Sequence, residues 1–148
     1  MLPIEINQVH PIMEKPTLVQ PTDKPIHVLL CATGSVAAIK IPELIQRFNS
    51  ETMVSGTKLF KVRVILTKGS QHFITSEQIW KVDDSVECFT DADEWAIWSQ
   101  KGDPVLHIEL RKWADILLIA PLDCNTLAKL SVGMCDNLVV GCNISSST

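Results

Sequence analysis

Polar residues that could bind a ligand follow three short apolar segments of the chain. Residues 33–35 read TGS, residues 67–70 read TKGS and residues 123–126 read DCNT, and each group comes directly after a run typical of a buried strand. If these strands are parallel neighbours, their carboxyl ends meet at one edge of a sheet, where doubly wound α/β proteins bind ligands. We therefore expect the three turns to open onto one site.

The first turn belongs to the segment TGSVAAIK, which places Gly34 and Ser35 between a strand and the start of a helix. Unpaired backbone N–H groups and the helix dipole favour an anion there, so one interpretation is a phosphate bound at Ser35. A plain turn, in which Gly34 supplies backbone freedom and Ser35 caps the helix, explains the same residues. The segment matches neither the GxxxxGK pattern nor the GxGxxG pattern of nucleotide-binding loops.

The other two turns offer a cation, hydroxyl groups and a carboxamide. Thr67 and Lys68 suit a planar, charged cofactor, although solvated turn residues would look the same. In the segment PLDCNTLAK, Asn125 can bond to both the donors and the acceptors of a heteroaromatic ring. The alternative is that Asn125 and Thr126 only cap a helix.

His107, in the segment DPVLHIELRKW, is the candidate acid or base, because imidazole alone among side chains ordinarily titrates near neutral pH. From its spacing alone, a histidine in such a segment is more often structural than catalytic. No metal site is indicated.

The cysteines are odd in number and form no CxxC pair, so we interpret them as thiols that serve first as small buried apolar residues. They are Cys31, Cys88, Cys124, Cys135 and Cys142.

The elements that must position these groups follow from the apolar pattern. We predict strands at Ile26–Ala32, Lys61–Thr67 and Asp115–Ala120, a weaker strand at Ser85–Phe89, and helices at Val36–Phe48 and Asn125–Leu130. Pro42 either distorts the first turn of its helix or marks where the helix begins. Strands buried on both faces and separated by helices predict a doubly wound parallel α/β sheet, Rossmann-like or flavodoxin-like.

Composition limits the function classes. The chain has 148 residues, 46% of them hydrophobic, and a net charge of −4, which disfavours sequence-independent binding of nucleic acid. The first residues show neither a signal peptide nor a membrane span, so we expect a soluble, cytoplasmic protein. Five prolines in residues 1–25 predict a flexible leader, followed by an ordered domain over residues 26–140 and a polar tail over residues 141–148.

Taken together, these segments resemble the homo-oligomeric flavin-containing cysteine decarboxylases, most closely their phosphopantothenoylcysteine decarboxylase and halotolerance-protein branch. The resemblance covers about residues 26–138. Its most specific parts are TGSVAAIK, the block DADEWAIW with GDPVLHIELRKWAD, and LLIAPLDCNTLAK with GMCDNL. Several long blocks in the same order are much more specific than a single glycine motif.

The resemblance implies an FMN site and a catalytic base. It implies that FMN is bound by Gly34, Ser35, Val36, Thr67, Lys68, Asp123, Cys124, Asn125 and Thr126, and that His107 is the base. The match is not exact at Gly69, a position that can be serine in a relative. The implied reaction is FMN-dependent decarboxylation of 4′-phosphopantothenoylcysteine in coenzyme A synthesis, by a homotrimer with its site at a subunit boundary. Oxidation of the substrate thiol toward a thioaldehyde eases loss of carbon dioxide, and the ene-thiol is then reduced.

One departure from the family pattern affects the expected activity. The family's PxMNxxMW block and its later proton-donating cysteine are not found in these 148 residues, and VVGCNISSST after Leu138 does not match the family's continuation. We therefore expect a C-terminally truncated form that lacks the last strands and helices and cannot turn over alone. The alternatives are a non-catalytic partner subunit, such as a halotolerance-protein-like phosphatase regulator, and a generic flavin-binding module.

Overall fold

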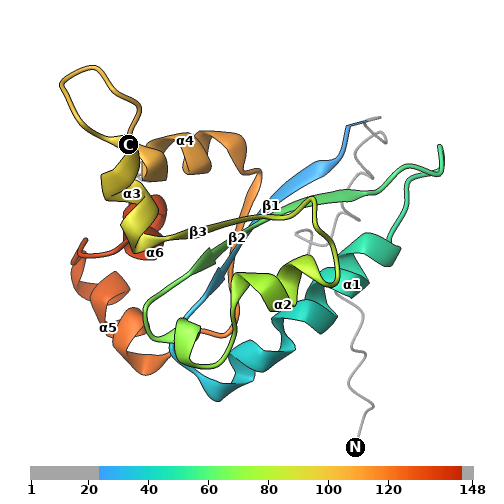
Figure 1. Ribbon diagram of the computed structural model, residues 1–148, viewed down its shortest axis with the longest axis horizontal. Coiled ribbons are helices and arrows are strands. Elements are labelled where there is room, and N and C mark those ends of the chain that lie inside the picture. The colour runs from blue at the N-terminus through green and yellow to red at the C-terminus, as the bar shows by residue number, and fades with distance from the viewer. Residues whose placement is uncertain (1–23, 145–148) are drawn as a thin grey trace, which may run out of the picture.

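Four parallel strands form the centre of the protein. The computed structural model describes residues 24–144, so nearly all of the predicted leader and the last four residues lie outside the described part. The strands are β1 (Ile26–Ala32), β2 (Phe60–Leu66), β3 (Glu87–Thr90) and β4 (Ile116–Ile119), in the order β3-β2-β1-β4 (Figure 1). Each neighbouring pair is parallel, as the apolar runs predicted.

Both faces of the sheet are buried because alternate side chains of the central strands pack into two different apolar clusters. In β1, Val28 and Leu30 face one cluster, whereas Leu29 and Cys31 face the other. All four side chains are almost completely buried. A strand with apolar residues on both faces therefore reads as a continuous apolar run, which is why β1 was recognisable from the sequence.

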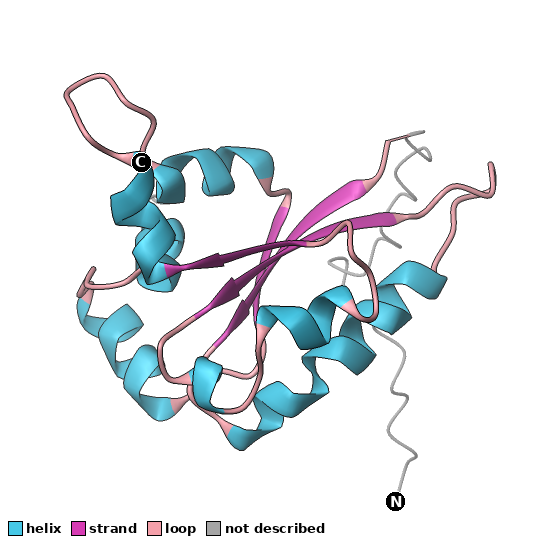
Figure 2. Cartoon of the chain, viewed as in Figure 1, coloured by secondary structure: helices cyan, strands magenta, loops and turns pink. Residues whose placement is uncertain are grey.

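Helices cover the sheet on both sides (Figures 1 and 2). On one face lie α1 (Ile41–Ser50) and α2 (Ser76–Trp80), and on the other lie α4 (Leu106–Trp113) and α6 (Leu138–Ile144). The short helix α3 (Asp91–Ile97) follows β3, and α5 (Cys124–Val132) follows β4. The 3-10 turns η1 (Val36–Lys40) and η2 (Ser70–His72) complete the described elements.

Local sequence explains where these helices start and stop. The predicted helix at Val36–Phe48 is divided, because η1 forms first and α1 begins at Ile41 with Pro42 in its first turn, where the missing N–H costs nothing. Capping boxes at Thr75 and Thr90 begin α2 and α3. Gly133, with φ of 69°, ends α5 in the left-handed conformation.

The sequence missed four of the six α-helices that the structure describes in residues 24–144. It assigned no helix to residues 76–80, 91–97 or 106–113, and it placed residues 141–144 in a polar tail. Residues 141–144 are instead the second half of α6, and Cys142 on that helix is fully buried. These helices are short, five to eight residues, so their periodicity is a weak signal.

The strand order creates a switch point beside β1. The chain leaves β1 toward β2 on one side and returns on the other side as β4, so the turns after these strands lie next to one another. The strand arrows in Figure 2 run toward this edge, where α5 and the 3-10 turns lie. The predicted doubly wound parallel α/β fold is confirmed, and its ligand edge can be located.

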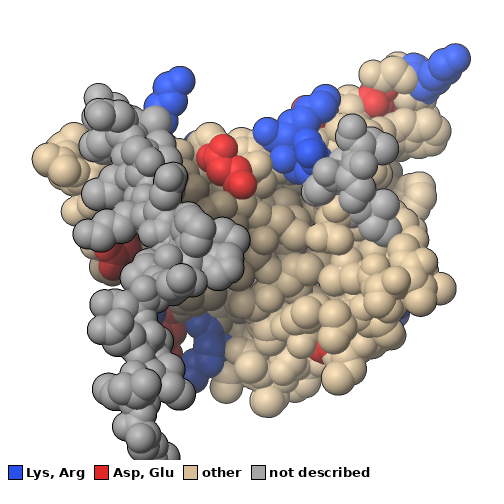
Figure 3. Space-filling view, turned by 180° about the vertical axis from the view of Figure 1, so that it is seen from behind, with Lys and Arg blue, Asp and Glu red and all other residues tan. Residues whose placement is uncertain are grey.

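The surface shows where apolar side chains remain exposed. β4 is an edge strand in the described sheet, and Ile116 on it is 46% exposed. The face shown in Figure 3 carries scattered basic groups rather than a continuous basic area. Within residues 24–144, no helix combines the length and apolarity needed to cross a bilayer.

Candidate functional site

The three turns predicted from the sequence meet at the carboxyl edge of the sheet, joined by hydrogen bonds. The Thr33 hydroxyl donates to the Pro121 carbonyl at 2.7 Å and accepts from the Asp123 N–H at 2.7 Å. The Thr67 hydroxyl donates to the Ala32 carbonyl at 3.1 Å. Residues 88 to 90 positions apart in the chain are therefore fixed beside one another, as expected for a switch point.

Two glycines allow the first and second turns to approach closely. A Cβ atom placed on Gly69 would lie 3.0 Å from the Cα of Gly34, and one placed on Gly34 would lie 3.0 Å from Oδ2 of Asp123. Neither glycine has a positive φ, so space and not backbone conformation requires them. A serine at position 69, as a relative can carry, would force these two turns apart in this chain.

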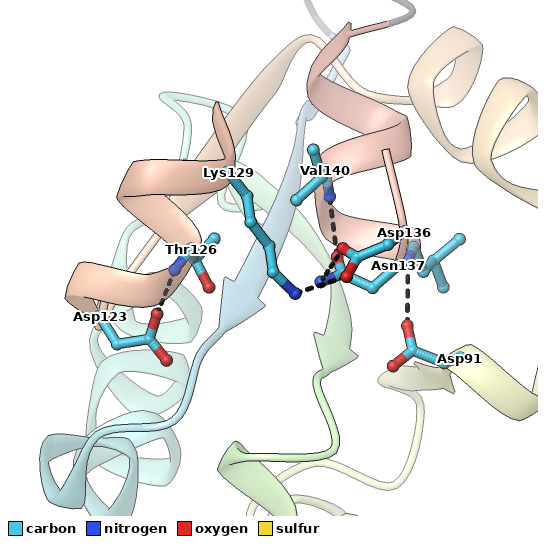
Figure 4. A network of polar contacts seen from close by, with 8 residues as sticks. Asp91, Asp123, Thr126, Lys129, Asp136, Asn137 and Val140 are labelled. Carbon is cyan, nitrogen blue, oxygen red and sulfur yellow. Dashed lines mark hydrogen bonds and ion pairs between the residues drawn. The ribbon is translucent and has the colours of Figure 1, made fainter. Parts of the chain in front are cut away.

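Asp123 braces the turns with both of its carboxylate oxygens. Oδ2 accepts from the Gly34 N–H at 2.8 Å, and Oδ1 accepts from the Thr126 N–H at 2.6 Å, which makes Asp123 the N-cap of α5 (Figure 4). Partial burial works to raise the pKa of this carboxyl, but the hydrogen bonds from Thr126 and Gly34 outweigh it, and the pKa lies below its ordinary value. Asp123 is therefore an ionised bridge between two turns.

The structure shows which of the polar turn residues cap a helix, the alternative role considered for them in the sequence. Ser35 caps η1, because its hydroxyl accepts from the Ala37 N–H at 3.3 Å. In the third turn, Asp123 is the cap, and neither Asn125 nor Thr126 is. Asn125 consequently sits exposed in the first turn of α5, and no protein partner is recorded for its carboxamide among the described residues.

Seven of the nine predicted cofactor residues divide into an inner group and an outer group. Thr67 and Thr126 are buried and Asp123 is engaged by the backbone, so these three hold the turns in place. The side chains of the outer group are exposed, and they are Val36, Lys68, Cys124 and Asn125. The structure thus presents a cation, a carboxamide and an apolar side chain at an edge whose shape the inner group maintains.

His107 lies in a separate pocket. It is in the first turn of α4, half-buried, and its Nδ1 forms a hydrogen bond with Oε1 of Glu94 on α3. The pocket has a volume of about 260 Å³, and its other walls are Asp91, Trp95, residues 135–137 and Gly141. No residue of the three turns lines it.

Polar contacts link the pocket to α5, the helix that begins at the third turn (Figure 4). Lys129 on α5 reaches Asp136 at 2.6 Å, and Asp136 lines the His107 pocket. On its other side, Oδ1 of Asp91 accepts from the Leu138 N–H at 2.9 Å, which ties α3 to the start of α6. The two features are therefore neighbours connected through the α5–α6 loop.

The cysteines only partly follow the prediction. Cys31 and Cys142 are buried, and burial raises the pKa of the Cys142 thiol to about 12, with nearby negative charge adding to the effect. Burial likewise raises the pKa of the Cys88 thiol to about 11. Cys124 and Cys135 are exposed, so the interpretation as buried apolar residues is wrong for these two. Within residues 24–144, no group of three or more possible ligands could hold a metal ion.

Sequence reasoning missed Glu94 and Gly141. Glu94 stood in the block DADEWAIW, for which no element was predicted, and its pairing with His107 depends on how α3 packs against α4. A Cβ on Gly141 would lie 3.3 Å from Cγ of His107, so this glycine gives the imidazole room. Neither signal can be read without the packing of α3, α4 and α6.

Comparison with known proteins is consistent with this geometry. The family model described as Flavoprotein matches residues 17–145, which is most of the chain. This chain belongs to the Flavoprotein family. Among curated members with related sequence, a phosphopantothenoylcysteine decarboxylase of Arabidopsis thaliana is 47% identical over 121 residues, which cover 82% of this chain and 53% of that protein.

Solved structures of Flavoprotein-family relatives show the same fold. The FMN-binding protein AtHal3 superposes with a TM-score of 0.70 at 44% identity, covering 82% of this chain and 60% of that one. A mutant PPC decarboxylase complexed with pantothenoylaminoethenethiol gives a TM-score of 0.70 at 44% identity, covering 82% of this chain and 61% of that one. The chain spans about half the length of the curated relatives it matches.

Proposed function

We propose that this chain binds FMN and carries the base of an FMN-dependent carboxy-lyase that acts on 4′-phosphopantothenoylcysteine in coenzyme A synthesis. The observation that carries the proposal is the convergence of three turns, which leaves Lys68 and Asn125 exposed at the ligand edge of a Flavoprotein-family fold. A relative of known structure is named as an FMN-binding protein. Another is a decarboxylase in complex with pantothenoylaminoethenethiol.

The residues at the edge fit the chemistry of FMN. Two of the three turns carry a glycine, Gly34 or Gly69, and glycine lets a large ligand approach the backbone closely. The Lys68 ammonium suits the phosphate, and the Asn125 carboxamide can both donate to and accept from the polar atoms of the ring. When bound, FMN supplies a reversible two-electron oxidation of the substrate thiol, which makes the loss of carbon dioxide easy.

The protein's own chemical contribution is proton transfer at His107. Its imidazole lines a pocket of about 260 Å³, large enough for the reacting end of a substrate. An imidazole can both accept and donate a proton, so His107 is suited to act as the base in this pocket. The other predicted site residues bind FMN, either through direct contact or by shaping the turns that hold it. They are Gly34, Ser35, Val36, Thr67, Lys68, Asp123, Cys124, Asn125 and Thr126.

The proposal includes assembly as a homotrimer in the cytoplasm. The apolar side chains exposed on α3 and at its end support an interface there, because Trp95 is 76% exposed and Trp98 is 47% exposed. No residue of the FMN turns lines the His107 pocket, so a second copy could bring its turns to that pocket.

Titration of FMN into the purified 148-residue chain tests the proposal. We expect quenching of flavin fluorescence with saturation, and about tenfold weaker binding for both Lys68→Ala and Asn125→Ala, the loss expected for one good polar contact. The control is Lys61→Ala, because Lys61 is an exposed lysine at the opposite end of β2. If FMN does not bind, or if Lys61→Ala weakens binding as much as the other two, the assignment fails.

A further inference from the structure

The contact between Glu94 and His107 bears on which ring nitrogen carries the proton. Nδ1 of His107 faces Oε1 of Glu94, and both side chains are mostly buried, with exposed fractions of 26% and 19%. An ionised carboxylate only accepts hydrogen bonds, so Nδ1 must be the donor in this pair. A neutral imidazole then presents Nε2 as an acceptor.

The other carboxylates near the pocket are occupied elsewhere. Asp91 accepts from the backbone N–H of Leu138, and Asp136 pairs with Lys129. Among the described residues, Glu94 is the carboxylate within hydrogen-bonding distance of the His107 ring. The pairing is therefore specific to one residue of α3.

The surrounding elements hold both partners in place. The capping box of Thr90 with Asp93, the residue before Glu94, fixes the start of α3. Gly141 of α6 packs against the ring with no side chain between them, as the distance of 3.3 Å from its Cβ position to Cγ of His107 shows. The imidazole is thus held at Nδ1 by Glu94 and along its side by α6.

We propose that Glu94 is a positioning residue that holds His107 in the Nδ1–H tautomer, so that Nε2 is the atom that exchanges a proton with the substrate. The part of this inference that gives the proton a role in catalysis rests on the proposed function. The tautomer of His107 itself does not depend on FMN binding or on turnover. Carboxylates that orient a catalytic histidine through its second nitrogen act in the same way in hydrolases.

The test is nitrogen NMR of the imidazole rings in the 148-residue chain, recorded at a pH where His107 is neutral. The signal of His107 is assigned by its loss in His107→Asn. We expect the proton on Nδ1 in the wild-type chain. In Glu94→Ala the ratio of Nδ1–H to Nε2–H should fall by about tenfold or more, because a hydrogen bond to a charged group is lost and free imidazole prefers Nε2–H.

Glu109→Ala is the matched control, because Glu109 is an exposed glutamate on α4 that pairs with Lys112 and not with His107. It should leave the tautomer ratio unchanged. The inference is overturned if the wild-type ring carries its proton on Nε2, or if folded Glu94→Ala keeps the wild-type ratio. If Glu94→Ala does not fold, Glu94→Gln replaces it, since its amide can pair with either tautomer and both should then appear. An unchanged ratio in Glu94→Gln would count against the inference.

Failure of this inference and failure of the proposed function give different results. A chain that does not bind FMN but shows the Nδ1–H tautomer, lost in Glu94→Ala, contradicts the proposed function alone. A chain that binds FMN but carries the His107 proton on Nε2 contradicts the role of Glu94 alone. The two measurements therefore separate the two claims.

Discussion

Asp123 and Asn125 lie two residues apart but have different surroundings. The Asp123 carboxylate points inward and accepts from two backbone N–H groups, whereas the Asn125 side chain remains exposed. The resemblance assigned both to cofactor binding. The structure supports a division of tasks, in which an ionised brace sets the shape of the turn and the carboxamide beside it is available to the ligand.

Replacement of Asp123 by Asn should weaken this brace. The amide group has only one acceptor oxygen, so one backbone N–H loses its partner, and we expect a loss of about 1–2 kcal/mol in the free energy of unfolding at pH 7. Urea unfolding of the wild type and the variant measures this loss in free energy. The control is Asp84→Asn, because Asp84 is exposed and no hydrogen bond is recorded for it among the described residues.

The pH dependence of the same variant follows from the lowered pKa of Asp123. A carboxyl whose pKa is lower in the folded state contributes stability above its unfolded pKa, about 4, and loses it as pH falls through the folded value. The difference in unfolding free energy between wild type and Asp123→Asn should therefore shrink below about pH 4. A difference that stays constant down to acid pH would show that the charge of Asp123 has no part in the brace.

At the scale of elements, the ligand edge depends on how closely two turns pack. Gly34 and Gly69 follow different strands, and a Cβ on Gly69 would lie only 3.0 Å from the Cα of Gly34. The β1–β2 pairing, which runs from Ile26 with Phe60 to Ala32 with Leu66, brings these two turns to the same level. The register of the sheet thus sets the geometry of the site.

Gly69→Ala should separate the two turns. Its Cβ would lie 3.0 Å from the Cα of Gly34, and backbone atoms cannot yield as a flexible side chain can. We expect a cost of roughly 1–3 kcal/mol in stability and weaker FMN binding. Thermal unfolding and fluorescence titration measure the two effects. Wild-type stability and affinity in Gly69→Ala would show that the turns are not packed as described.

At the scale of the whole molecule, the three turns of the ligand edge and the His107 pocket are neighbouring but separate features. The ion pair between Lys129 and Asp136 connects the pocket to α5, which begins at the third turn, and no residue of the three turns lines the pocket. The exposed apolar surface lies beside the pocket, on α3 and at its end. This arrangement favours a site completed by another copy of the chain, as the proposed homotrimer requires.

The proposed assembly can be tested at this surface. By light scattering after gel filtration, we expect a mass three times the 16.4 kDa of one chain. Trp98→Lys should lower the mass to that of a monomer, because a charge would be buried in an apolar interface. Val54→Lys is the control, since Val54 is equally apolar and fully exposed but lies in the loop between α1 and β2. A wild-type monomer would contradict the trimer.

The sequence by itself determined the strands, the fold class and the three turns of the ligand edge. Long apolar runs such as Ile26–Ala32 make a buried strand evident without tertiary information, and the polar residues that follow must lie at the carboxyl end of the sheet. The blocks around Gly34, His107 and Asn125 also indicated the family, which the match over residues 17–145 confirms.

Only the tertiary structure decided what each side chain at the site contacts. That Asp123 turns inward, that Gly34 and Gly69 touch, and that Glu94 meets His107 all depend on the packing of elements distant in sequence. The helices that create the His107 pocket are too short for periodicity to reveal. Their positions are stabilised by burial against the sheet, a long-range effect that local residue pattern does not encode.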